Sequence, residues 1–387
     1  SLPMDFGFTD EQIAIRDTAK RFASDRLAPH YRQRERDGAI GQELAAEMGA
    51  LGLIAVDTPE EIGGLGLDCV TAGVVVEEIA CGDISVSYLQ LVGSIHGHIL
   101  AAHGEPAMAA QVMSEICAGT SIMALGLTEP GGGSDAANLK LTARRDGDDY
   151  VLNGEKASIS MITQSDRILL FARTGTQEEK ARGVSTFVVP LEDANISRAA
   201  YDDLGHGAVG RGSVFFDDVR IPGECLIGEE GGGFRQVMHA FDFSRAMIGL
   251  QVLGCARASL EEAWQYSTER EAFGKPIAAF QGVTQPLAEC ETMFEAARLL
   301  CYKTLWLRDH DLPHTTEAAM CKWWAPRVAF DIIHRCLLTH GHMGYTKDLP
   351  HEQRLRDVLG LQIGDGTDQI QKMIIAREKV GRISLPY

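Results

Sequence analysis

The stretch Leu361-Gln-Ile-Gly-Asp-Gly-Thr-Asp-Gln-Ile-Gln-Lys-Met-Ile-Ile-Ala-Arg-Glu378 places an acidic residue between two glycines, directly before a helical pattern. Gly364 and Gly366 leave the backbone free to hold the carboxylate of Asp365 out into a cavity. Apolar residues at positions 370, 373 and 374 then recur at helical spacing and predict a helix with one buried stripe.

Two interpretations of this stretch are open from its own residues. Asp365 is a general base on a short loop, or it merely caps the helix that follows. Thr367 and Asp368 are also placed to cap the helix. The choice between the two interpretations depends on the rest of the chain.

The composition is that of an ordinary globular chain, but it is strongly acidic. The 387 residues are 45% hydrophobic and 23% charged, which is enough for two or three domains around a large core. The formal net charge is −18, from 54 acidic and 36 basic residues. Because nucleic acids and anionic membranes are bound by clustered Lys and Arg, neither is expected as the main partner.

Cysteine usage and the first residues indicate a cytoplasmic protein. The nine cysteines are scattered and form no CxxC pair, which predicts reduced thiols and no zinc site. Residues 1–11 have neither a basic start nor an apolar run, and no stretch of about 20 apolar residues occurs. We therefore expect no signal peptide and no membrane span.

Other titratable clusters are expected to be structural. His96, His98 and His103 lie close together, but their helical surroundings favour packed or surface roles over a metal site. The acidic side chains at 77, 78 and 83 are expected on solvated helix faces. No metal ligand is therefore predicted.

The pattern of apolar residues divides the chain into three parts. Residues 1–120 predict a helical domain, with helices near 42–51, 68–80, 94–102 and 106–118. Residues 121–231 predict an antiparallel β-domain, with strands near 122–127, 139–144, 150–152, 167–172, 184–189 and 213–216. Residues 232–387 predict a bundle of long helices near 232–270, 281–310, 315–342 and 368–381. The predicted fold class is α+β, mostly α.

The loop Thr128-Glu-Pro-Gly-Gly-Gly-Ser-Asp135 follows the first predicted strand. Pro130 fixes its own φ, while three glycines let the backbone approach a ligand and offer amides to phosphate or flavin edges. Thr128 and Ser134 add hydroxyl groups. A long turn between strands is the simpler alternative for this loop.

These stretches together resemble the acyl-CoA dehydrogenases, flavoproteins that introduce an α,β double bond into an acyl-CoA thioester. The resemblance covers essentially the whole chain. Besides the loop at 128–135, it is carried in order by Leu152-Asn-Gly-Glu-Lys156, Phe216-Asp-Asp-Val-Arg-Ile-Pro222, Leu226-Ile-Gly-Glu-Glu-Gly-Gly-Gly-Phe234, Glu269-Arg-Glu-Ala-Phe-Gly-Lys-Pro276, Leu355-Arg-Asp357 and Asp365-Gly-Thr367.

The resemblance implies a fold, a cofactor and partners. The family has a helical domain, a β-domain and a C-terminal four-helix bundle, usually assembled as a homotetramer. FAD lies between the β-domain and the bundle, and a neighbouring subunit reaches its pyrophosphate and adenine. Electrons from the acyl-CoA substrate are expected to pass to electron-transfer flavoprotein.

By the same resemblance, Asp365 is the catalytic base. It takes the α-proton of the thioester while the β-hydrogen leaves as hydride to flavin N5. The family usually has Glu at this position, and often an aromatic residue where this chain has Gly364. The shorter side chain withdraws the carboxylate by about 1.5 Å, so both departures enlarge the space over the α-carbon.

The cofactor and substrate positions carry over residue by residue. The residues matched to FAD contacts are Leu127, Thr128, Ser160, Arg270, Phe273, Gln281, Thr367 and Gln369. Those matched to the acyl-CoA are Ser134, Phe241, Asp242, Arg245, Gly364 and Gly366. Ser158 stands where the family often has a Trp beside the flavin, and Leu338 and His342 replace residues of the adenine loop.

The implied environment of Asp365 acts on its pKa in two directions. The helix N-terminus lowers the pKa and an apolar pocket raises it. We expect bound substrate to let the upward effect prevail. The thioester oxygen would accept hydrogen bonds from the Asp365 amide and a flavin ribityl hydroxyl, which stabilise the developing enolate.

Further stretches resemble the cyclohexane-1-carboxyl-CoA dehydrogenase branch of the family. They are Lys156-Ala-Ser-Ile-Ser-Met161, Asp202-Asp-Leu-Gly205, Ala240-Phe-Asp-Phe-Ser-Arg245 and Met320-Cys-Lys-Trp-Trp-Ala-Pro326. The product would be cyclohex-1-ene-1-carboxyl-CoA. Relatives that act on an unsaturated ring use a second carboxylate near positions 90–91, where this chain has Gln90 and Leu91, so simple α,β-removal is favoured.

Three alternatives remain beside this prediction. A short or branched-chain acyl-CoA dehydrogenase would use the same residues on a smaller thioester. A nitroalkane-type flavin oxidase of the same superfamily also uses an Asp base. A non-catalytic flavoprotein scaffold, as in a few relatives that bind DNA, is disfavoured by the acidic charge.

Overall fold

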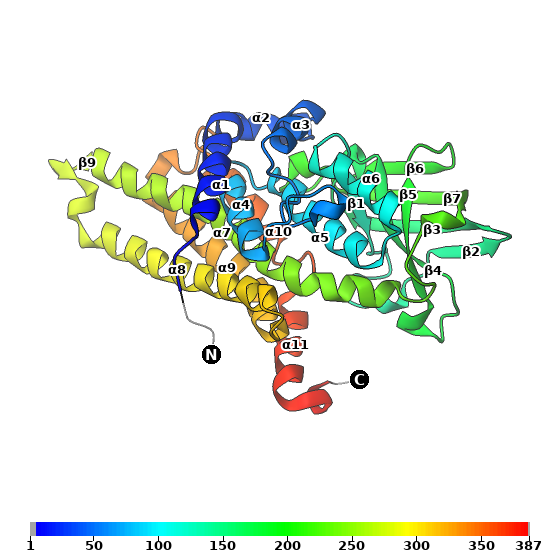
Figure 1. Ribbon diagram of the computed structural model, residues 1–387. Helices are drawn as coiled ribbons and strands as arrows, with labels where there is room; N and C mark the ends of the chain where they lie inside the picture. Colours follow the sequence, from blue (N-terminus) through cyan, green and yellow to red (C-terminus); the bar gives the residue numbers. More distant parts are fainter. Residues whose placement is uncertain (1–4, 386–387) are drawn as a thin grey trace.

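Helices, then strands, then helices again follow one another along the chain, as the sequence predicted (Figure 1). The computed structural model describes residues 5–385. Residues 1–4 and 386–387 lie outside the described residues, and with them the start of the stretch used to predict that no signal peptide is present. The mostly helical α+β class is confirmed, while the domain limits at 120/121 and 231/232 stay predictions.

Six helices form the first part of the chain. They are α1 (Asp10–Phe22), α2 (Tyr31–Asp37), α3 (Gln42–Ala50), α4 (Cys69–Gly82), α5 (Ser87–His103) and α6 (Pro106–Cys117). A reciprocal pair of hydrogen bonds between Thr9 and Gln12 caps α1. The prediction missed α2 and started α5 seven residues late, because residues 87–93 are buried on every face and so show no helical period.

The prediction of solvated acidic faces was wrong for Glu77, Glu78 and Asp83, which are 1%, 5% and 1% exposed. Helix α4 packs between α7 (Gly233–Glu269) and α8 (Gln281–Asp309), so these positions face neighbouring helices. Glu77 accepts hydrogen bonds from Arg257 (3.2 Å) and Arg298 (2.7 Å), and Glu78 accepts one from Arg257 (2.7 Å). Buried carboxylates here are paired with cations from other helices, which a single sequence does not reveal.

Eight strands form one mixed sheet in the order β6-β7-β3-β2-β4-β5-β8, with β1 beside β4. The antiparallel prediction needs correction, because β1 runs parallel to β4, with Met123 opposite Arg167, and β2 touches β4 in parallel. The glycine-rich loop connects β1 and β2, which both run parallel to β4, β1 beside its first residues and β2 beside its last. The strands are β1 (Met123–Gly126), β2 (Thr142–Asp146), β3 (Asp149–Ile159), β4 (Arg167–Arg173), β5 (Val184–Pro190), β6 (Ile196–Ala200), β7 (Gly212–Pro222) and β8 (Leu226–Ile227).

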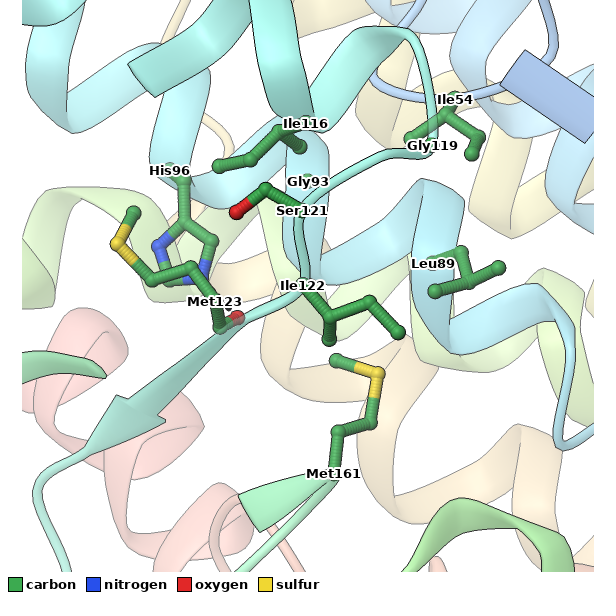
Figure 2. A pocket seen from close by; sticks show the side chains of 10 residues that line it. All are labelled: Ile54, Leu89, Gly93, His96, Ile116, Gly119, Ser121, Ile122, Met123 and Met161. Atoms are coloured by element: carbon green, nitrogen blue, oxygen red, sulfur yellow. Dashed lines mark hydrogen bonds between the residues drawn. The ribbon is translucent and has the colours of Figure 1, made fainter. Parts of the chain in front are cut away.

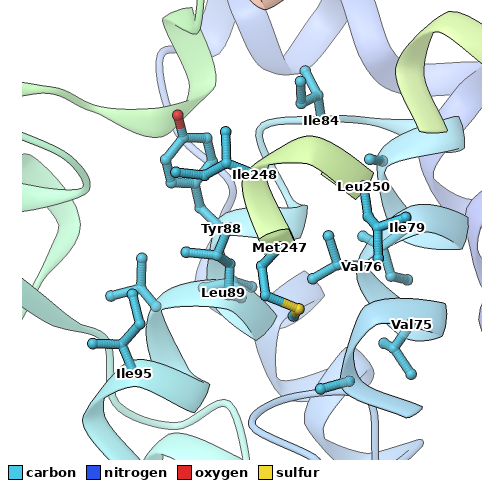
Figure 3. Packing of buried hydrophobic residues seen from close by; sticks show 14 of the residues in the cluster. Val75, Val76, Ile79, Ile84, Tyr88, Leu89, Ile95, Met247, Ile248 and Leu250 are labelled. Atoms are coloured by element: carbon cyan, nitrogen blue, oxygen red, sulfur yellow. The ribbon is translucent and has the colours of Figure 1, made fainter. Parts of the chain in front are cut away.

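Helix α7 organises the second helical part. It contacts α4, α5, α8, α9 (Thr315–Thr339) and strand β5, and its middle turns are almost wholly buried. Figure 3 shows Met247, Ile248 and Leu250 of α7 packed against α4 and α5. The chain ends with α10 (His351–Gly360) and α11 (Asp368–Val380), and α11 projects from the bundle in Figure 1.

A short arm extends from the end of α7. Strands β9 (Glu271–Ala272) and β10 (Lys275–Pro276) form a two-stranded hairpin before α8 begins. Figure 1 places this arm at the opposite end of the molecule from the β-sheet. Within residues 5–385, the helices are all too short or too polar to cross a membrane.

The buried pairs of α4 predict a large stability cost for Glu77→Ala. Removal of the carboxylate leaves two arginines without their shared acceptor, and the free energy of unfolding should fall by about 3 kcal/mol. Thermal melting of the purified protein measures the change. Glu261→Ala is the control, because Glu261 is an exposed side chain 3.7 Å from the same Arg257 and should cost less than about 0.5 kcal/mol. Equal melting temperatures for the two variants would contradict the interpretation.

Candidate functional site

The loop between α10 and α11 holds Asp365 in a left-handed backbone conformation. Its φ is 57°, a region that Asp tolerates better than most side chains. Gly366 follows with φ 96°, and a Cβ there would collide with the amide of Gln371. A Cβ at Gly364 would make only an ordinary contact, 3.7 Å from a backbone oxygen, so the space beside it is open.

The predicted helix start is present, but its side-chain cap is not. Thr367 occupies the N-cap position of α11 without a side-chain hydrogen bond to the helix. Asp368 instead pairs with Arg327 of α9, at 2.9 Å between Nε and Oδ2. Neither Thr367 nor Asp368 therefore caps α11 with its side chain.

Lys322 of α9 binds this loop through its side chain. Its role was not predicted from the sequence. Its Nζ donates to the carbonyl of Leu361 at 2.7 Å and to the carbonyl of Gly366 at 3.0 Å. The side chain is fully buried. A single lysine within the otherwise apolar run 318–326 of a helix was the available signal.

The surroundings of Asp365 act on its pKa from two sides. Asp365 is exposed, but the protein atoms that surround its carboxylate take it partly out of water and raise its pKa. The positive charges of Lys322 and Arg245 oppose this effect. The net direction is upward in the protein without substrate, and the opposing effect comes from these two cations. The expected effect of bound substrate stays a prediction.

Helix α7 supplies the second cation. Arg245 is 8% exposed, its Nη1 donates to Asp242 at 3.2 Å, and its guanidinium lies 5.9 Å from the ring centre of Phe241. Its buried Nε finds no acceptor among the described residues. An unpaired buried donor beside a carboxylate is suited to a polar group of a bound molecule.

Tyr88 of α5 also lies near Asp365, which the sequence analysis missed. Burial raises the pKa of Tyr88, and the negative charges of Asp365 and Asp357 raise it further. Figure 3 shows its ring beside Ile248 of α7. The loop is therefore faced by α9, α7 and α5.

A second buried lysine holds the glycine-rich loop after β1. The Nζ of Lys156 donates to Leu127 O at 3.0 Å and to Glu129 at 2.8 Å, and burial lowers the pKa of Lys156 to about 8. Glu129 in turn accepts the backbone amides of residues 140 and 141. Leu127 is buried, Thr128 is half-buried and Ser134 is exposed on this loop.

The end of β3 approaches the same region. Ser160 follows the strand and is half-buried, and Ser158 has φ 58°. The Ser158 amide donates to the hydroxyl of Tyr201 at 3.3 Å, and that hydroxyl is 2.7 Å from Ser213 Oγ. An aromatic ring thus stands beside position 158.

Other predicted site residues are not brought to Asp365 within one chain. Arg270, Phe273 and Gln281 lie on or next to the β9–β10 arm, and all are exposed, Phe273 by 95%. Gln369 is exposed on the first turn of α11. The arm and the sheet lie at opposite ends of the molecule in Figure 1.

Figure 2 shows a cavity between α5, α6 and the start of β1 that is too small for an acyl group. Its volume is about 10 Å³, close to the lower limit for one water molecule. His96 lines it and bonds through Nε2 to Met123 O at 2.8 Å. Burial lowers the pKa of His96 to about 4, so the ring is neutral and packed.

Asp57, Cys69 and His98 bring ligand-type atoms within 4.8 Å of one another. Asp57 already bonds to His98 at 2.6 Å and to Ser94. Burial and the charge of Asp57 raise the pKa of Cys69 far above that of a free thiol, so the thiol stays protonated. The Asp57 carboxylate is already engaged by Ser94 and His98, although Nδ1 of His98 has no partner among the described residues, and a protonated thiol is a poor metal ligand.

Three family profiles match the chain in order. They are described as the N-terminal, middle and C-terminal domains of acyl-CoA dehydrogenase and match residues 9–120, 124–219 and 231–380. Among curated relatives, the mitochondrial short-chain specific acyl-CoA dehydrogenase of Rattus norvegicus is 35% identical, over 94% of this chain and 88% of the relative. Subunit CarC of the caffeyl-CoA reductase–Etf complex of Acetobacterium woodii is 32% identical, over 95% and 98%.

A solved structure has the same fold over its whole length. Butyryl-CoA dehydrogenase from Megasphaera elsdenii superposes with a TM-score of 0.93 at 31% identity. The match covers 97% of this chain and 100% of that protein.

The buried pair of Lys156 and Glu129 predicts a local effect for Lys156→Met. Loss of the ammonium leaves Glu129 buried without its cation, and the loop 127–134 should open more often. Amide hydrogen exchange in this loop should become at least about tenfold faster, since each 1.4 kcal/mol of local stability is a factor of ten. Lys140→Met, at an exposed side chain, should leave the exchange unchanged. Equal exchange in all three proteins would contradict the role of Lys156.

Proposed function

Since this chain belongs to the acyl-CoA dehydrogenase family and is an FAD-dependent oxidoreductase, we propose that Asp365 is the base that removes the α-proton of its acyl-CoA substrate. The observation that carries the proposal is the loop itself. It presents one carboxylate with a raised pKa between Lys322 and Arg245. A carboxylate whose pKa is raised is a stronger base than an ordinary one, and it accepts a proton more readily once substrate excludes water.

The residues of this chain fit a bound FAD. A Cβ at Gly131 or Gly132 would meet no atom within 4 Å, so the backbone of this loop is open to a ligand. We assign the flavin to Leu127, Thr128 and Ser160, with Thr367 and Gln369 beside it. When bound, the flavin supplies the hydride acceptor for the β-hydrogen. Tyr201 takes the aromatic place that Ser158 leaves open.

The acyl-CoA would lie along the start of α7. Phe241, Asp242 and Arg245 share one segment of this helix, and the hydroxyl of Thr315 fixes Asp242 at 2.7 Å. Ser134 would face the pantetheine. The amide of Asp365 would donate to the thioester oxygen, and Gly364 and Gly366 would leave room for the substrate.

Cyclohexane-1-carboxyl-CoA is our proposed substrate, with cyclohex-1-ene-1-carboxyl-CoA as product. The open space at Gly364 and the short side chain of Asp365 support an acyl group branched at the α-carbon. A short-chain acyl-CoA is the second candidate, because the rat relative is named short-chain specific and the solved structure is a butyryl-CoA dehydrogenase. The ring of Tyr88 beside the loop favours a compact acyl group in either case.

The remaining assignments concern partners. Electron-transfer flavoprotein is the proposed acceptor, supported by CarC, whose name places it in an Etf complex. A homotetramer would bring Arg270, Phe273 and Gln281 of one subunit to the FAD pyrophosphate and adenine of another. The exposure of all three on a projecting arm supports this assignment. We also propose a cytoplasmic location, supported by nine free cysteines.

The first test is Asp365→Ala in the FAD-loaded enzyme. Loss of the base should lower the rate constant of anaerobic flavin reduction by at least about a thousandfold, while FAD stays bound. Flavin absorbance after mixing with the acyl-CoA measures both properties. Reduction at the unaltered rate would show that another group takes the proton. Reduction of the unaltered enzyme by a nitroalkane, with peroxide formed and no response to any acyl-CoA, would instead support the oxidase alternative.

The substrate proposal is tested by Asp365→Glu. The longer side chain advances the carboxylate by about 1.5 Å into the space assigned to the ring. The ratio of kcat/KM for cyclohexane-1-carboxyl-CoA to kcat/KM for butyryl-CoA should fall at least about tenfold. An unchanged ratio would remove the space argument. A higher kcat/KM of the unaltered enzyme for butyryl- or isobutyryl-CoA would favour the short-chain candidate.

A further inference from the structure

Lys322 is a buried ammonium group without a close carboxylate. Its side chain is fully buried, and among residues 5–385 it makes no ion pair within 4.0 Å. Lysine is almost never buried in this way unless it is paired, because the charge loses its hydration. The cost of burying the Lys322 ammonium must therefore be offset by other interactions.

Two carbonyl groups provide that compensation, and both belong to the loop of Asp365. One acceptor, Leu361 O, stands at the end of α10, and the other, Gly366 O, directly follows Asp365. The ammonium thus ties the two ends of the segment 361–366 to α9. Asp365 lies within this closed segment, so the lysine fixes the point from which the carboxylate extends.

Three helices bring charged or titratable side chains to the loop. Lys322 from α9 and Arg245 from α7 face Asp365, and Tyr88 faces it from α5. The negative charges of Asp365 and Asp368 raise the pKa of Lys322, and the positive charge of Arg245 lowers it. Burial lowers the pKa of Lys322 to about 8 against the pull of the two carboxylates. Near neutral pH the lysine is charged.

We propose that Lys322 is a positioning residue for Asp365, which fixes the loop through two carbonyl groups and keeps the carboxylate ionised before substrate enters. The proposal rests on the role of Asp365 as the base. Arg245 does not perform the first task, because its described hydrogen bond goes to Asp242 of its own helix.

Two variants separate the two tasks. Lys322→Met keeps the length of the side chain and removes both the donor and the charge. Lys322→Gln keeps a donor for the two carbonyl groups and removes the charge. Lys303→Met is the control, since Lys303 is an exposed lysine on α8, 3.8 Å from Glu317.

Hydrogen exchange of the FAD-loaded protein without substrate tests the positioning alone. In Lys322→Met, amide exchange in residues 361–367 should be at least about tenfold faster than in the unaltered enzyme, and exchange in α5 should stay the same. Lys303→Met should match the unaltered enzyme throughout. Unchanged exchange in residues 361–367 of Lys322→Met would overturn the positioning role, and this result does not depend on which substrate reduces the flavin.

The pH profile of flavin reduction tests the charge. Removal of a nearby cation raises the pKa of a carboxyl, so the acidic limb of the reduction rate should move to higher pH by about one unit in both Lys322 variants. At the pH optimum, the flavin of Lys322→Met should be reduced about a hundredfold more slowly than that of the unaltered enzyme, because the base is misplaced. The reduction rate of Lys322→Gln should fall by a smaller factor. A lysine with only a structural role would lower the melting temperature and leave the acidic limb in place. An acidic limb that does not move in Lys322→Gln therefore overturns the proposal, even if Lys322→Met does not fold. If no acyl-CoA reduces the flavin of the unaltered enzyme, the proposed function is overturned, while the hydrogen-exchange result still tests the positioning of the loop.

Discussion

The contact between the ammonium of Lys322 and the carbonyl groups on either side of Asp365 is the constraint on which the site depends. A buried lysine is costly, and two carbonyl acceptors at 2.7 and 3.0 Å offset that cost only if the loop stays closed around it. The same device recurs at Lys156, which binds Leu127 O and Glu129 below the glycine-rich loop. Both loops assigned to the reaction are therefore held by a lysine of a neighbouring element.

Packing around α7 places these two loops on one framework. Helix α5 contacts both α7 and β1, and α9 contacts both α7 and α11. The buried acidic residues of α4, paired with arginines of α7 and α8, lock the helices against sliding. A shift of one helix would therefore move Asp365 relative to the glycine-rich loop at 128–135.

Much of this organisation could be predicted from the sequence, because it is written in local patterns. The period of apolar residues predicted the long helices, and the glycines on either side of Asp365 predicted a flexible loop before the last helix, where the structure places Asp365 with a φ of 57°. The antiparallel sheet was wrong, since the direction of β1 depends on a partner far along the chain. The start of α5 was missed because a segment buried on all sides has no periodicity.

The roles of Lys322, Lys156 and Tyr88 were beyond the sequence for a different reason. Each acts through a contact with a residue at least 27 positions away, and a lysine in an apolar helix has the same letters whether it reaches solvent or binds a loop. The same limit applied to Glu77, whose arginine partners lie 180 and 221 residues further on. Chemistry-bearing residues were visible in the sequence, whereas the residues that hold them in place became visible only in three dimensions.

The central claim is that the Asp365 carboxylate faces the α-carbon of a bound thioester. A crystal structure of the FAD-loaded enzyme with an unreactive acyl-CoA analogue tests it most directly. The carboxylate should lie within about 3.5 Å of the α-carbon, on the side opposite the flavin ring. A structure in which residue 365 turns outward, with another group over the α-carbon, would contradict the claim.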